Sequence, residues 1–278
     1  MKSAVVVFTK VPKVGEVKTR LTEAKGGILT PEEAKDFYQA SLLDVLDSCI
    51  EADCCDIYIC QNKDGDTHYL KEITTTLSKP GAIKEIFVDE GKTFDQGMQY
   101  AADYILQNCG ENRLADSVII LGGDIPVFQP ATLREAVKKL EMLAASAEGL
   151  ECAQRANGYE CRIGAGLVES IDQEGGFNLI GYTCTTPFDF DGVFYNRYGF
   201  TALDMIAQKV TEKNIPVSIV EMIPDVDLPG DLASLIPAMN TLRLAAKYDS
   251  GIKLPRRTDE FLLNMGLVTS APVPDKYK

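Results

Sequence analysis

Residues 3–21 read SAVVVFTKVPKVGEVKTRL, and this stretch decides the class of fold. Its first part, Ser3 to Thr9, holds a continuous apolar and β-prone run from Val5 to Phe8. A strand that is apolar on both faces is typical of a parallel sheet with helices on both sides. The sequence therefore predicts an α/β protein in which this first strand is buried.

Helices and strands are expected to alternate after this strand. Thr30, Pro31 and Glu33 form a capping-box start, which predicts a helix from Pro31 to about Ala52. Apolar runs predict strands at 56–61, 83–89 and 117–121, and helices are expected from Thr93 and from Pro130 to about Ala147. This alternation indicates β-α units and a parallel sheet.

The second half of the chain departs from that alternation. Residues 162–169 and 177–184 are typical of two strands joined as a hairpin, so we expect a mixed, mostly parallel sheet. We expect a helix at 199–213 and a strand at 217–222. Two further helices are expected, one from residue 230 and one near 258–265. No composition break marks a linker. We expect one domain over residues 1–240, followed by a helical extension and a loosely held polar tail over 241–278.

Composition excludes several classes of function. The 278 residues carry a formal net charge of −13, which argues against a wide basic face for nucleic acid. The first apolar run ends at Phe8, which is too short for a signal peptide. No stretch approaches the roughly 20 apolar residues that cross a bilayer. The eight cysteines include no C-x-x-C pair, so we expect reduced thiols in a cytoplasmic protein.

The single histidine limits the possible chemistry. A Ser-His-Asp or Cys-His mechanism would have to use His68, which lies in the polar stretch 63–68 with no nucleophile nearby. We expect His68 at the surface. Carboxylates and a metal ion are the better candidates for catalysis.

The loop after the first strand is unusually basic for an acidic protein, with Lys10, Lys13, Lys18 and Arg20. Ligands of open α/β sheets bind at the carboxyl ends of the strands, where this loop is expected. Arg20 can offer a planar fork to a phosphate, and Lys18 a point charge. The alternative is a solvated basic loop with no ligand.

Residues 121–126, LGGDIP, directly follow an apolar strand. Asp124 would lie at the tip of that strand, and Gly122 and Gly123 would let a ligand approach the backbone. Mg²⁺ prefers one or two carboxylates together with phosphate oxygens, which suits Asp124. The alternative is a turn in which Asp124 bonds its own backbone.

Two further segments hold candidate residues. Residues 225–232, DVDLPGDL, follow the late strand, and only one of Asp225 and Asp227 need face a site. Asp227 is also suited to cap the next helix, and Asp231 to lie in its first turn. Residues 174–181, EGGFNLIG, are typical of a hairpin connection with glycines.

Four motifs in this order resemble those of the bacterial GT-A-like glycosyltransferases of the radical-SAM/selenodomain-associated transferase 1 type. Lys10 to Leu21 is similar to K-x-P-x-x-G-x-V-K-T-R-L, and residues 122–126 are similar to G-x-D-x-P. Residues 174–181 and 225–232 resemble D-G-G-Y-x-L-x-G and D-x-D-T-P-x-D-L. The chain departs from the pattern at Thr9-Lys10, at Glu174 and at Leu228.

The resemblance implies a single-domain Rossmann-like GT-A fold of the nucleotide-diphospho-sugar transferase superfamily. It implies that Lys10, Lys18 and Arg20 bind a nucleotide's phosphates, and that Asp124 and Asp227 bind Mg²⁺ or Mn²⁺. Glu174, Gly175 and Gly176 would approach the sugar or acceptor, with Glu174 as the candidate catalytic residue. We expect glycosyl transfer from a nucleotide-diphosphate sugar. Nucleotidyl transfer of the guanylyltransferase type and nucleotide binding without catalysis stay open as alternatives.

Overall fold

The computed structural model describes residues 1–172 and 174–269, and its described strands form one sheet of order β3-β2-β1-β4-β6-β5-β7. Among these strands, β6 runs antiparallel to β4 and β5, and the other neighbours are parallel. The expected mixed, mostly parallel sheet is therefore confirmed. The strands are β1 (Ser3–Thr9), β2 (Asp56–Gln61), β3 (Ile83–Val88), β4 (Ser117–Gly122), β5 (Leu167–Ser170), β6 (Leu179–Thr183) and β7 (Val217–Val220).

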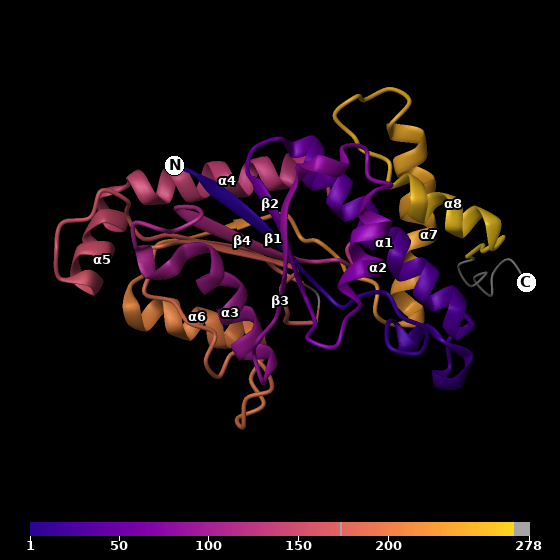
Figure 1. Ribbon diagram of the computed structural model, residues 1–278, viewed down its shortest axis with the longest axis horizontal. Coiled ribbons are helices and arrows are strands. Elements are labelled where there is room, and N and C mark those ends of the chain that lie inside the picture. The colour runs from indigo at the N-terminus through magenta and orange to yellow at the C-terminus, as the bar shows by residue number, and fades with distance from the viewer. Residues whose placement is uncertain (173, 270–278) are drawn as a thin grey trace, which may run out of the picture.

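Helices cover both faces of the sheet. Figure 1 shows α4 above the sheet and α3 and α6 below it. Helices α2 and α5 were not expected from the sequence, whereas α1 has the predicted bounds and the predicted capping box. The helices are α1 (Pro31–Ala52), α2 (Thr67–Thr74), α3 (Phe94–Leu106), α4 (Pro130–Ala145), α5 (Ala147–Asn157), α6 (Ala202–Lys213), α7 (Pro229–Ala245) and α8 (Arg256–Asn264).

The apolar run of β1 is buried from both sides, as its composition predicts. Val5 and Val7 pack in the core formed with α1, α2 and α4. Ala4 and Val6 pack in the opposite core, formed with α3, α5 and α6. Alternate residues of a strand point to opposite faces, so a strand between two helical layers must be apolar at successive positions.

A third apolar cluster joins the end of the chain to α1. Phe37 of α1 packs there with Leu21, Val226 and Leu262, the last from α8. Figure 1 shows α7 and α8 beside α1, away from α4 and α5. Helix α7 continues to Ala245, so the boundary expected near residue 240 lies inside a helix. Of the expected loose tail, residues 270–278 lie outside the described part of the chain.

Candidate functional site

A cavity of about 880 Å³ opens where β1 and β4 end at the carboxyl edge of the sheet. Ligand sites are expected at this edge of an open α/β sheet. Most of the residues proposed from the sequence lie together here. Those that line the cavity are Lys10, Lys18, Gly122, Gly123, Asp124, Glu174, Gly175, Gly176 and Asp227.

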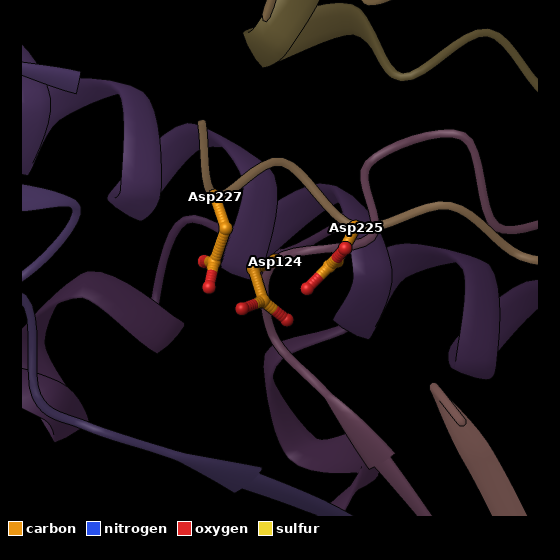
Figure 2. A group of neighbouring side chains, drawn as sticks. All are labelled: Asp124, Asp225 and Asp227. Atoms are coloured by element: carbon orange, nitrogen blue, oxygen red, sulfur yellow. The ribbon is translucent and has the colours of Figure 1, made fainter. Parts of the chain in front are cut away.

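Three carboxylates meet on one wall of this cavity. Figure 2 shows Asp124, on the loop after β4, facing Asp225 and Asp227, which lie on the segment between β7 and α7. One oxygen from each side chain lies within 4.8 Å of the others. The N–H of Val226 donates to the carbonyl of Asp124 at 3.1 Å, which fixes the two segments against each other.

Asp225 was expected to be dispensable if Asp227 faced the site, and the structure brings both to it. Residues two apart in extended backbone point the same way, so the spacing itself indicates a shared face. The capping role considered for Asp227 is not observed, because the helix cap is Leu228. Asp231 lies in the first turn of α7 as expected, and its carboxylate accepts the N–H groups of Asp227 and Leu228.

Lys18 is the cation of this wall. Its Nζ donates to Asp124 at 2.8 Å and to Asp227 at 2.5 Å, and its side chain is only 5% exposed. Burial disfavours the ammonium charge, but the attraction of Asp124 and Asp227 outweighs burial and raises the pKa of Lys18. Its backbone is left-handed, with φ of 46°, and the preceding Val17 is buried.

Arg20 lies at the border of the site and is not among the residues that line the cavity. Its guanidinium donates to the second oxygen of Asp227 at 3.2 Å, while its side chain is 66% exposed. Lys18 and Arg20 thus pair with the aspartates of the site, and their binding of a ligand stays a prediction. The alternative of a solvated basic loop fits Lys13, which is exposed and pairs with Glu16.

The three carboxylates suit a hard divalent cation. Burial and the neighbouring charges of Asp124 and Asp227 raise the pKa of Asp225 to about 7. A positive ion lowers the electrostatic repulsion among such neighbouring carboxylates, and carboxylate oxygens are the preferred ligands of Mg²⁺. The donor set therefore fits Mg²⁺ or Mn²⁺, and it includes Asp225 as well as the two expected ligands.

The glycines after β4 serve packing inside the protein. A Cβ on Gly122 would lie 2.5 Å from the Asp124 carboxylate, and one on Gly123 would lie 2.8 Å from Leu42. The carbonyl of Gly123 also accepts a hydrogen bond from Ser41 of α1 at 2.9 Å. Both glycines also line the cavity, so the predicted close approach of a ligand to their backbone stays a prediction.

The opposite wall holds residues that sequence reasoning missed. Asp172, Phe177, Phe194, Tyr195 and Phe200 line it together with the predicted Glu174. Glu174 is exposed, whereas Asp172 is half-buried. The richness of residues 188–197 in aromatic and acidic side chains was a signal for this wall, although it fits a cover of the sheet equally well. His68 is exposed on α2, as expected.

Within residues 1–172 and 174–269, no helix is long and apolar enough to cross a membrane.

Two solved structures share this architecture. A Desulfovibrio desulfuricans G20 protein, provisionally described as a nucleotide-diphospho-sugar transferase, matches with a TM-score of 0.66 and 20% identity, over 95% of this chain and 98% of its own. A cytidylyltransferase from Leptospira borgpetersenii serovar Hardjo-bovis (strain JB197) matches with a TM-score of 0.50 and 12% identity, over 99% of both chains. At these identities the matches establish the fold, which is that of the nucleotide-diphospho-sugar transferases.

A comparison with curated proteins finds no match. The model of a bacterial family does match residues 45–197, which is more than half of the chain. The chain therefore belongs to the family described as "Uncharacterized protein conserved in bacteria (DUF2064)".

Proposed function

We propose that this protein transfers a glycosyl group from a nucleotide-diphosphate sugar to an acceptor. One observation carries the proposal: Asp124, Asp225 and Asp227 converge with Lys18 at the carboxyl edge of the sheet, on a cavity of about 880 Å³. The motifs quoted above support the finer assignment to the radical-SAM/selenodomain-associated transferase 1 type. The spacing of the cysteines, without a C-x-x-C pair, supports the proposed cytoplasmic location.

A divalent ion bound by Asp124, Asp225 and Asp227 would offset the charge of the donor's diphosphate and of the leaving nucleotide. Lys18 and Arg20 border the same place and carry the remaining positive charge. When a diphosphate enters the cavity, the Lys18 ammonium and the Arg20 guanidinium can donate hydrogen bonds to phosphate oxygens in place of Asp227. Charge that develops on the departing diphosphate is then stabilised by groups already in position.

In the proposed reaction, the acceptor's hydroxyl oxygen forms a bond to the anomeric carbon of the sugar. The bond from that carbon to the diphosphate oxygen breaks, and its electron pair leaves with the nucleoside diphosphate. The hydroxyl proton passes to a carboxylate of the opposite wall. Glu174 is the proposed base because it lines the cavity and its exposed carboxylate can reach solvent.

A thermal-shift panel tests the proposal, with nucleoside diphosphates, triphosphates and nucleotide sugars, each with and without Mg²⁺ or Mn²⁺. A ligand present at 100 times its dissociation constant adds about 2.7 kcal/mol to the free energy of unfolding. We expect a metal-dependent shift with nucleotide sugars that Asp124→Asn abolishes. Asp36→Asn, on the exposed face of α1, is the matched control and should keep the shift.

The products decide which group is transferred. Release of a nucleoside diphosphate from a nucleotide sugar supports glycosyl transfer. Release of pyrophosphate from a nucleoside triphosphate would instead indicate nucleotidyl transfer. Nucleotide binding without either product would indicate a protein that binds nucleotides without catalysis.

A further inference from the structure

The cavity has two ends of different chemistry. Its aspartate end holds Asp124, Asp225 and Asp227 together with Lys18. Its aromatic end is built by Phe177, Phe194, Tyr195 and Phe200, together with the carboxylates of Asp172 and Glu174. Arg197 belongs to the same loop as Tyr195, but its guanidinium lies over the Tyr198 ring at 4.8 Å. Lys92, two residues before Phe94, also lines the cavity, so the carboxylates of Asp172 and Glu174 outnumber the single cation near these rings.

The rings at this end are held in place by their neighbours. Phe194 packs edge-on against Phe94 with ring centroids 4.6 Å apart, and against Phe177 at 5.4 Å. The Asp95 carboxylate, at the start of α3, accepts the N–H groups of Gly192 and Phe194 at 3.1 and 2.8 Å. A ring surface that is already ordered binds a ligand at a lower entropic cost.

Two of these rings are not part of any core. Tyr195 is 94% exposed and Phe200 is 55% exposed, although both line the cavity. Their loop is nevertheless ordered, because Asn196 Oδ1 accepts the N–H groups of Tyr198 and Phe200 at 3.1 and 3.2 Å. Tyr195 has a φ of 49°, a left-handed conformation that is costly for a bulky residue and that marks functional segments. Exposed, ordered rings at a cavity offer flat apolar faces to a ligand.

Asp172 supplies a polar contact beside these rings. One of its carboxylate oxygens is buried and accepts no hydrogen bond from the described residues. The side chain as a whole is half-buried and lines the cavity, so its carboxylate can accept a hydrogen bond from a ligand hydroxyl. The same negative charge repels a phosphate, and so does that of Glu174.

We infer that the aromatic end binds the acceptor, and that the acceptor is an uncharged hydroxyl compound with a flat apolar face. Either the C–H face of a sugar ring or an aromatic ring has this chemistry. Tyr195 and Phe200 stack on the face, and Asp172 accepts a hydrogen bond from a hydroxyl group. The inference rests on the proposed glycosyl transfer, and it disfavours the phosphorylated acceptor that nucleotidyl transfer needs.

Ligand-observed NMR titrations test the inference with three probes. Methyl β-D-glucopyranoside represents a sugar face, 4-methylphenol an aromatic ring, and glucose 1-phosphate a phosphorylated acceptor. The test variant is Tyr195→Ala/Phe200→Ala. The control is Tyr248→Ala, because Tyr248 is 86% exposed and is not among the residues that line the cavity.

We expect at least one neutral probe to bind the wild type and to bind the double variant about five-fold more weakly or worse. Tyr248→Ala should leave that affinity unchanged, and Asp172→Asn should weaken it. The neutral probe that responds identifies the sugar or the aromatic source. We expect the affinity for glucose 1-phosphate to be the same in the wild type and the double variant. The inference is overturned if glucose 1-phosphate depends on the rings, or if neither neutral probe does.

The nucleotide thermal-shift panel, repeated on the double variant, separates the two proposals. Only the acceptor inference is overturned if nucleotides raise the melting temperature in a metal-dependent way but the two rings do not affect the affinity for either neutral probe. If the affinity for a neutral probe depends on the rings but no nucleotide stabilises the protein, the aromatic subsite is supported and the glycosyl-transfer proposal is overturned.

Discussion

The three aspartates of the cavity wall, which lie on the segments after β4 and β7, form one acidic group that contrasts with the single acid Glu169 within β5. Lys18 and Arg20 pair with aspartates of the first group, which also faces the cavity. Glu169 is 8% exposed, and its Oε2 accepts no hydrogen bond from the described residues. Burial alone raises the pKa of Glu169 to about 7. A buried acid thus indicates a functional site when cations and a cavity accompany it, and not by its altered pKa alone.

The largest effect is expected from Asp124→Asn, which removes a proposed metal ligand but keeps the shape of the side chain. Loss of several kcal/mol of charge stabilisation should lower metal-dependent turnover by about 10²- to 10³-fold. Release of nucleoside diphosphate from a nucleotide sugar measures it, with Asp36→Asn as the control. Full turnover in the variant would show that the aspartates, like Glu169, have no part in catalysis.

Glu169→Gln should affect stability and its dependence on pH. Burial raises the pKa of Glu169 from its ordinary value of 4.5 to about 7, so this contribution to stability falls as pH rises between those values. This shift in the pKa of Glu169 corresponds to about 3 kcal/mol in the free energy of unfolding. Urea unfolding at pH 5 and pH 8 should show that the variant lacks this loss.

The control for that measurement is Glu160→Gln, because Glu160 is exposed. It should keep the wild-type difference between the two pH values. An equal pH dependence in Glu169→Gln and the wild type would mean that Glu169 is already ionised in the folded protein.

Lys18→Met should leave Asp124 and Asp227 without their buried cation. We expect the free energy of unfolding to fall by about 2 kcal/mol in the absence of metal, less than for a fully buried pair because both aspartates are partly exposed. Mg²⁺ or Mn²⁺ should restore much of it, as denaturant titrations with and without metal would show. A loss that metal does not reverse would point to packing rather than charge.

Arg20→Gln is expected to have the smallest effect on stability. The guanidinium is 66% exposed, and exposed ion pairs contribute less than about 1 kcal/mol. The same denaturant titration measures this difference against Lys18→Met. A loss equal to that of Lys18→Met would show that the pair with Asp227 is stronger than its exposure suggests.

Strong local signals made part of the fold predictable. The bounds of β1 and α1 agree with the prediction, because one is a continuous apolar run and the other begins with Thr30, Pro31 and Glu33. Helix α2 was missed because it has eight residues, of which only Leu70, Ile73 and Thr74 are buried. A short element with so few apolar positions has no clear helical period.

The candidate site was predictable where a motif ends a strand, as at Asp124. The pairing of Lys18 with two aspartates was not, because residues 18, 124 and 227 meet only through the tertiary fold. The aromatic wall was open to interpretation for the same reason. A sequence shows that Phe194 and Tyr195 are adjacent, but only the fold shows that the first is packed and the second is exposed.

The hydrogen bond from Val226 to the carbonyl of Asp124 makes the far end of the chain matter to the site. Val226 is buried in the cluster that contains Leu262 of α8, although no described residue beyond Asp227 lines the main cavity. A truncation before α8 would therefore remove support from beneath the aspartates without deleting any of them. Shortened versions of this protein that lose activity should not be read as evidence that the last helix touches a substrate.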